Sequence, residues 1–230
     1  MLPLRDNLPT RRFPVVTVAL IVANVLVFVL YQNAGQGEGF LSSVNDLAFR
    51  PCEVEDSCPT AGEGPFVTLF SSMFLHADWL HLLGNMLFLW IFGNNVEDTL
   101  GRPRFIAFYV LGGVAAMATQ SAITLGFGDP ADAAIPNLGA SGAISAVLGA
   151  YFVLFPHGRV LTLILPFFLF PLPASLFLGI YFVLQALVGG LSFMSPEQGG
   201  GVAYFAHIGG IVFGILTIRL FAAGRLRPRY

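Results

Sequence analysis

Six long stretches without a charged residue constrain the fold of this chain more than any other feature of its sequence. A helix of about 20 apolar residues crosses a hydrocarbon core of about 30 Å. Only 10% of the residues are charged, whereas a soluble domain has about 25%. We therefore expect an all-α integral membrane protein. The uncharged stretches cover residues 13–37, 79–96, 105–128, 133–156, 160–196 and 198–218.

The fifth stretch is too long for one span and slightly short for two spans with a turn. Its first half contains Pro166, Pro171 and Pro173, and proline breaks a helix interior. We therefore predict a span over about 173–191, preceded by an interfacial segment over 160–172 that does not cross the membrane.

Two other apolar segments need an assignment. The run 13–31 has nineteen residues, longer than the roughly 7–15 of a signal-peptide core, and is predicted to be the retained first span. The run 66–75 lies directly before Asp78 and is predicted to be a second interfacial or re-entrant piece.

The positions of the arginines predict the orientation. With six crossings, ten of the eleven arginines lie on one side and Arg50 lies alone on the other. The arginine-rich side is cytoplasmic by the positive-inside rule, so both termini are expected in the cytoplasm. Seven crossings would export the C-terminal arginines. We expect a cytoplasmic N-terminal segment 1–12, a six-span domain 13–222 with an outer loop 32–65, and a cytoplasmic tail 223–230.

Four polar residues of the predicted spans lie at a similar depth. His81 and Asn85 begin the second span and share a helix face as i,i+4 neighbours. Ser141 lies at the outer start of the fourth span and His207 near that of the sixth. Polar groups inside a membrane are costly and are functional candidates. Their coincidence in depth on three helices is more informative than any one of them.

Small residues would allow the fourth and sixth spans to approach closely. This would bring Ser141 within hydrogen-bond reach of His207, as an activated nucleophile and its general base. His81, Asn85 and the Ser141 backbone N–H would then donate hydrogen bonds to an oxyanion. No carboxylate lies at this depth, so the prediction is a Ser–His dyad. The small residues include Gly142, Gly210 and Gly214.

Each of these residues also has a purely structural interpretation. Serine is common at membrane helix interfaces, His207 would serve as an interhelical histidine, and Asn85 would tie helices together. His76, close to Asp78, would order the start of the second span. The histidines and the two cysteines show no metal-ligand spacing, so no metal is expected. The net charge of −2 gives no basic field for nucleic acid.

Taken together, the motifs resemble those of the rhomboid family of intramembrane proteases. The resemblance covers roughly residues 13–220, and the order, the spacing and the six-span frame all agree. The matching motifs are His76-x4-His81-x3-Asn85, Gly93-Asn94-Asn95-Val96-Glu97-Asp98-Thr99-Leu100-Gly101, Gly139-Ala140-Ser141-Gly142-Ala143-Ile144 and Ala206-His207-x2-Gly210-x3-Gly214.

The resemblance implies a rhomboid-like bundle of six transmembrane helices and an intramembrane serine endopeptidase. It implies Ser141 as the nucleophile, His207 as the general base, and His81 and Asn85 in the oxyanion hole, with His76 nearby. Rhomboids cleave transmembrane proteins near the outer membrane face and need no cofactor. The supporting residues it implies are Gly139, Gly142, Gly210 and Gly214.

The resemblance also bears on partners and location. In several rhomboids the fifth span and its outer loop, about 173–200 here, act as a lateral gate. The expected partners are transmembrane protein substrates and membrane lipid, and the expected location is the bacterial plasma membrane. The sequence indicates no oligomeric state.

Two positions depart from the family pattern. Many rhomboids have an aromatic residue four positions after the serine, beneath the histidine ring, where this chain has Ser145. The Trp-Arg pair of many first outer loops is absent from 32–65, which carries Cys52 and Cys58 instead. An even number of cysteines in an oxidising compartment predicts a disulfide between these two.

Two other classes of function fit a protein with several spans. A catalytically inactive rhomboid relative would bind or escort membrane clients, but such relatives usually lack the serine or the histidine. A small transporter would show paired inverted repeats and broken helices in both halves, and neither is visible in this sequence.

Overall fold

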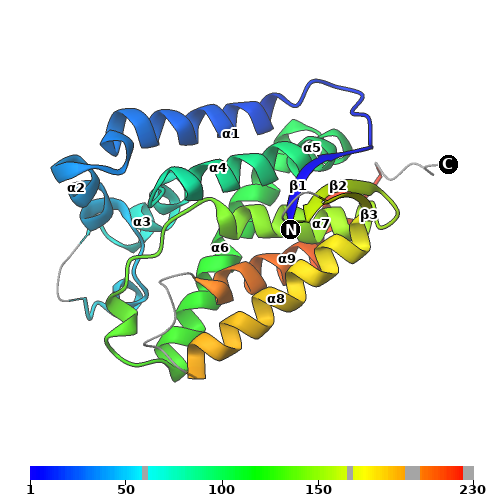
Figure 1. Ribbon diagram of the computed structural model, residues 1–230. Helices are drawn as coiled ribbons and strands as arrows, with labels where there is room; N and C mark the ends of the chain where they lie inside the picture. Colours follow the sequence, from blue (N-terminus) through cyan, green and yellow to red (C-terminus); the bar gives the residue numbers. More distant parts are fainter. Residues whose placement is uncertain (59–61, 165–167, 195–202, 225–230) are drawn as a thin grey trace.

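Helices running back and forth along one axis make up most of the protein (Figure 1). The computed structural model describes residues 1–58, 62–164, 168–194 and 203–224. In chain order the elements are β1 (Leu2–Asp6), α1 (Val15–Leu26), η1 (Val27–Tyr31), η2 (Asn33–Gly35), α2 (Gly37–Leu47), η3 (Pro51–Glu55), α3 (Pro65–Ser71), η4 (Ser72–Phe74), α4 (Trp79–Phe88), η5 (Leu89–Gly93), α5 (Asn94–Leu100), α6 (Arg102–Phe127), η6 (Asp132–Ala134), α7 (Ser141–Leu154), β2 (Arg159–Ile164), β3 (Phe168–Pro173), α8 (Ala174–Met194) and α9 (Tyr204–Phe221).

In the described residues, three helices are long and apolar enough to cross a membrane: α6, residues Ala174–Leu191 of α8, and α9. A fourth is added if the segments Pro65–Phe74 and Trp79–Leu100, bent by 83° at their junction, form one broken span or a re-entrant loop. The protein is therefore a mostly helical membrane protein, and the bend lies where the run 66–75 was expected to be interfacial or re-entrant.

Two shorter apolar helices, Val15–Tyr31 and Ser141–Leu154, belong to the same bundle. With 14 residues, α7 is about 21 Å long, which is less than the core of about 30 Å.

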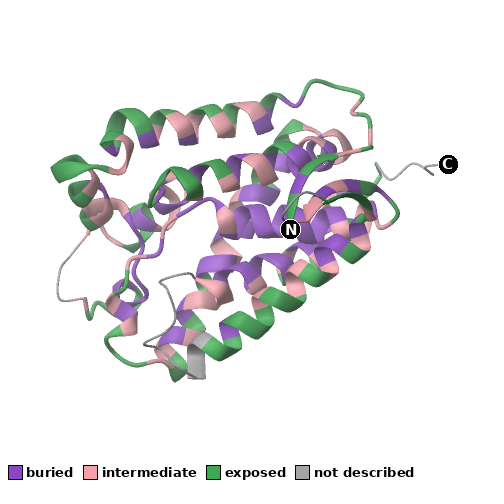
Figure 2. Cartoon of the chain, viewed as in Figure 1, coloured by how far each residue is buried: buried purple, intermediate pink, exposed green. Residues whose placement is uncertain are grey.

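The centre of the bundle is α7, whose residues from Gly142 to Tyr151 are all buried (Figure 2). The helix approaches α9 backbone to backbone. A Cβ atom added at Gly210 would collide with the carbonyl oxygen of Gly142, and one at Gly214 with that of Ala146. On the other side of α7, a Cβ at Gly142 would lie 2.7 Å from the Cβ of Ala116 of α6. The small residues noted in the sequence are therefore the points of closest helix contact.

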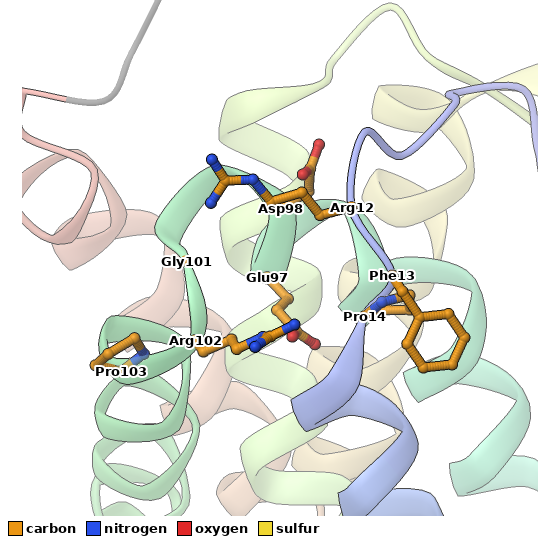
Figure 3. A pocket seen from close by; sticks show the side chains of 8 residues that line it. All are labelled: Arg12, Phe13, Pro14, Glu97, Asp98, Gly101, Arg102 and Pro103. Atoms are coloured by element: carbon orange, nitrogen blue, oxygen red, sulfur yellow. The ribbon is translucent and has the colours of Figure 1, made fainter.

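A buried carboxylate of α5 holds the start of α1 against that helix. Glu97 accepts hydrogen bonds from the backbone N–H groups of Val16 at 3.0 Å and Thr17 at 2.8 Å, and from the Thr17 hydroxyl at 2.8 Å. It thus satisfies N–H groups that have no acceptor within the helix. Figure 3 shows Glu97 in the pocket between these segments, whose lining residues also include Arg12 and Arg102.

A three-stranded antiparallel sheet, in the order β1–β2–β3, covers one end of the bundle, which we call the sheet end (Figure 1). The prediction of an all-α protein did not include it. The segment 160–172, expected to be interfacial, forms the hairpin of β2 and β3, although residues 165–167 lie outside the described residues. The prolines exclude helix here and are compatible with an edge strand.

Asp6 of β1 attaches the sheet to the helices. Its carboxylate accepts hydrogen bonds of 2.7 Å from the Tyr151 hydroxyl of α7 and from the Asn95 side-chain amide of α5. Burial raises the pKa of Asp6, and the hydrogen bond from Tyr151 opposes that rise in part.

The opposite end of the bundle, the loop end, contains α2, η3 and the starts of α4, α7 and α9 (Figure 1). Cys52 and Cys58 are joined there by a disulfide. Arg50 is buried beside them, donates a hydrogen bond to the Asn45 carbonyl at 3.0 Å, and lies 3.8 Å from the Glu53 carboxylate. The predicted tail 223–230 lies, from residue 225 on, outside the described residues, as do residues 195–200 of the expected gate segment.

Candidate active site

The Ser141 hydroxyl and the His207 ring meet at the loop end of the bundle. Ser141 is the first residue of α7 and His207 the fourth of α9. His207 Nε2 lies 2.8 Å from Ser141 Oγ. The contact exists because Gly210, one turn after His207, lies directly on the Gly142 carbonyl. The geometry is that of a serine whose proton a neighbouring histidine can accept.

His207 has a second side-chain partner. Its Nδ1 lies 2.8 Å from Oε1 of Gln185, on α8. Sequence reasoning missed Gln185. The available signal was an amide in the middle of an apolar span, which must find a hydrogen-bond partner there or remain costly.

The His81 ring lies on the other side of Ser141. The Asp78 carboxylate caps α4 by accepting a 2.8 Å hydrogen bond from the His81 backbone N–H. A Cβ at Gly139 would lie 2.8 Å from Cε1 and Nε2 of His81 and 3.7 Å from Ser141 Oγ. The positive φ of 120° at Gly139 and this close approach together require glycine at that position.

The hydrogen bond at Nδ1 indicates which nitrogen of His81 is the donor. The Ala77 backbone N–H lies 3.4 Å from His81 Nδ1, which is therefore the acceptor. In a neutral ring the proton is then on Nε2, the nitrogen next to Gly139 and Ser141. His81 thus presents an N–H toward the site.

Asn85 follows His81 by one turn of α4 and is buried. Its side-chain nitrogen has no hydrogen-bond partner among the described residues. A buried donor without an acceptor is rare in folded proteins. It is a feature expected where a charge develops only during a reaction.

His76 lies next to His81. Its ring is fully buried and meets the His81 ring edge-on, with centroids 5.1 Å apart. Its backbone is held by Gln32, which accepts from the His76 N–H at 2.8 Å and donates to its carbonyl at 3.1 Å. His76 therefore packs against an oxyanion-hole candidate and acts at most through it.

Ser145, the position where many rhomboids have an aromatic ring, is buried, and its hydroxyl interacts with that of Tyr181. Tyr181 lies on α8, one turn before Gln185. An aromatic side chain therefore reaches this position from a different helix.

In residues 1–58, 62–164, 168–194 and 203–224, no group of three or more His, Cys, Asp or Glu side chains is placed to hold a metal ion. The pocket of Figure 3 is at the sheet end and shares no lining residue with the Ser141–His207 site.

Comparison with known proteins gives a consistent family. The sequence profile of the rhomboid domain matches residues 63–224. The chain is 34% identical over 152 residues to "Rhomboid protein 1, mitochondrial" of Saccharomyces cerevisiae, covering 65% of this chain and 40% of that protein. It is 30% identical over 196 residues to the human "Presenilin-associated rhomboid-like protein, mitochondrial", covering 85% of this chain and 45% of that protein.

A plant relative aligns over more of the chain. "RHOMBOID-like protein 12, mitochondrial" of Arabidopsis thaliana is 28% identical over 225 residues, covering 92% of this chain and 60% of that protein. The chain thus spans between 40% and 60% of the length of these three relatives. The profile match contains all four motif regions, from His76 to Gly214.

Proposed function

The chain belongs to the rhomboid family, and we propose that it is an intramembrane serine endopeptidase that cleaves transmembrane proteins near the outer membrane face. The observation that carries this proposal is the 2.8 Å contact between Ser141 Oγ and His207 Nε2, beside an Asn85 amide with no partner among the described residues.

The first chemical step forms an acyl-enzyme. Ser141 Oγ attacks the carbonyl carbon of the scissile bond while its proton moves to His207 Nε2. The tetrahedral intermediate then collapses, the C–N bond breaks, and the proton on His207 passes to the leaving amine. In the second step water attacks the ester carbonyl, giving its proton to His207, and Ser141 leaves as the free hydroxyl.

The negative charge of the intermediate is on the former carbonyl oxygen. Three neutral donors are available to it: the Asn85 amide, the Nε2–H of His81, and the backbone N–H of Ser141, which starts α7 and has no acceptor within the helix. Neutral donors stabilise an oxyanion without placing a permanent charge in the membrane. We propose that these three groups form the oxyanion hole.

We propose six crossings, with both termini in the cytoplasm. The first crossing is formed by α1 and η1 together, the second by α4, η5 and α5 together, and the other four by the single helices α6, α7, α8 and α9. Two of these segments are shorter than a full span, so the count rests on the arginine distribution and the alternating helix directions. The sheet end is then cytoplasmic and the loop end faces outward. Reporter fusions at residue 159 and at the C-terminus should both indicate the cytoplasm.

The disulfide Cys52–Cys58 at the loop end is consistent with an oxidising outer compartment. We propose the bacterial plasma membrane as the location, although the three relatives named above are mitochondrial. The proposed partners are transmembrane protein substrates, with membrane lipid around the bundle.

Cleavage of a single-span substrate in proteoliposomes tests the function. We expect wild-type protein to release a product cut near the outer end of the substrate span, and Ser141→Ala protein to release none. An inactive relative or a transporter would give no product from the folded wild type. The absence of product would therefore contradict the proposal.

A further inference from the structure

We infer that Gln185 is a positioning residue for the general base, through which α8 sets the orientation and the tautomer of His207. This inference rests on the proposed function, because it assigns a role to Gln185 in the same reaction. Its starting point is the 2.8 Å contact between Gln185 Oε1 and His207 Nδ1.

The chemistry of the two groups decides which tautomer is present. An amide oxygen only accepts hydrogen bonds, so Nδ1 of His207 must carry the proton in this contact. In a neutral ring Nε2 is then unprotonated and faces Ser141 Oγ at 2.8 Å. This is the state in which the ring can accept the serine proton. The other tautomer would point an N–H at the nucleophile.

The position of Gln185 indicates that its side chain is committed to this contact. It lies in α8, which is exposed along much of its length (Figure 2), and the neighbouring Leu184 and Leu187 are exposed. An amide in such a helix is costly unless its polar atoms are hydrogen-bonded. Gln185 is placed on the face that meets His207.

Contacts one turn away on each side define that face of α8. Tyr181, at i−4, interacts through its hydroxyl with Ser145 of α7. Gly189, at i+4, approaches α9 so closely that an added Cβ would lie 2.9 Å from the Cβ of Tyr204. Residues at i−4, i and i+4 share one helix face, so Gln185 is held in register with His207 from both directions.

Three variants and the wild type test the inference, with kcat, KM and melting temperature measured across pH. Gln185→Leu keeps the size but removes the acceptor. We expect kcat to fall by about 10-fold, the usual worth of one neutral hydrogen bond, with KM nearly unchanged. Leu184→Ala, at the neighbouring exposed position, is the matched control and should match the wild type.

Gln185→Glu gives a readout that a merely structural role would not move. The carboxylate keeps the acceptor, so kcat at high pH should be close to that of the wild type. Its charge favours the protonated ring, so the acidic limb of the kcat profile should move to higher pH. Among the described residues, the titratable groups that interact with His207 are His81 and Tyr204. Tyr181 lies one turn before Gln185 on α8, and all three groups remain in every variant.

Unchanged kcat in Gln185→Leu, or an equal loss in Leu184→Ala, would overturn the inference. If Gln185→Leu does not fold, Gln185→Glu decides: a folded variant whose pH profile coincides with that of the wild type contradicts it. Absence of activity in the wild type would instead remove the proposed function itself. An active wild type with unaffected Gln185 variants removes only the role of Gln185.

Discussion

The two sides of His207 are held in different ways. On one side α7 and α9 are in backbone contact through Gly142 and Gly210, and α7 is buried over most of its length. On the other side α8 is largely exposed and reaches the site through two polar side chains, Tyr181 and Gln185. The first side determines where the histidine backbone lies. The second determines how its ring is turned.

This difference shows how a small membrane protein can position the proposed base although, in the part of the chain that the structure describes, no carboxylate is hydrogen-bonded to its ring. Close packing of small residues sets the distance between helices within a few tenths of an ångström, because a methyl group cannot be inserted. It leaves the ring torsion free. A neutral amide orients the ring without the cost of a charge inside the bilayer. Variants on the two sides should therefore have different effects.

The largest effect is expected for the reacting pair on the close-packed side. Ser141→Ala and His207→Ala should each lower kcat by on the order of 10⁴–10⁶, and the double variant should be no worse than either single one, because the two act as a unit. Single-turnover cleavage in proteoliposomes measures this. Additive losses would show that the residues act separately.

Asn85→Ala should have the next largest effect. Loss of one oxyanion donor typically costs about 2.7–4 kcal/mol, or 10²–10³ in kcat. The loss should be partial because His81 and the Ser141 N–H remain. If Asn85 only ties helices together, the melting temperature will fall while the folded fraction turns over normally. Both quantities should be measured on the same purified protein.

A pair of glycine substitutions compares the two sides directly. At Gly210 a methyl group would collide with the Gly142 carbonyl, whereas at Gly179 of α8 an added Cβ has no atom within 4 Å. Gly210→Ala should destabilise the protein by about 1–3 kcal/mol and reduce activity. Gly179→Ala should have no adverse effect, since alanine is the better helix former. Equal melting temperatures would contradict the account of the packing.

The smallest effect is expected at the sheet end, far along α7 from the reacting pair. Burial raises the pKa of Asp6, so the folded state binds its proton more tightly than the unfolded state. Stability should therefore decline as the pH rises from the unfolded value of about 4 through the folded pKa. Asp6→Asn should remove this component, with kcat little changed. A pH series of melting temperatures tests the sign, and an unchanged slope would contradict it.

The site was predictable from the sequence to the extent that short-range patterns specify it. The i,i+4 spacing of His81 and Asn85 and the small residues around Ser141 and His207 predicted the juxtaposition that the structure has. Gln185 was not predicted, because the apolar α8 has no strong periodicity to show which face meets α9. Its partner could be identified only once the helices were placed.

The sheet shows the same limit at the other end of the molecule. The prolines in 160–172 correctly excluded a crossing helix, because proline disrupts the helical hydrogen bonds. They could not reveal that β2 would pair with β1, more than 150 residues earlier in the chain. Pairing over such a separation depends on the bundle, through contacts such as the one between Asp6 and Tyr151.

The central claim, that Ser141 is a nucleophile activated by His207, is tested most directly by locating a covalent adduct. Folded protein is treated with a fluorophosphonate, which phosphonylates activated serines, and the modified residue is identified by peptide mass spectrometry. We predict a single adduct on Ser141 that is lost in His207→Ala protein. A folded wild type without an adduct, or an adduct on Ser141 that forms equally fast without His207, would contradict the account.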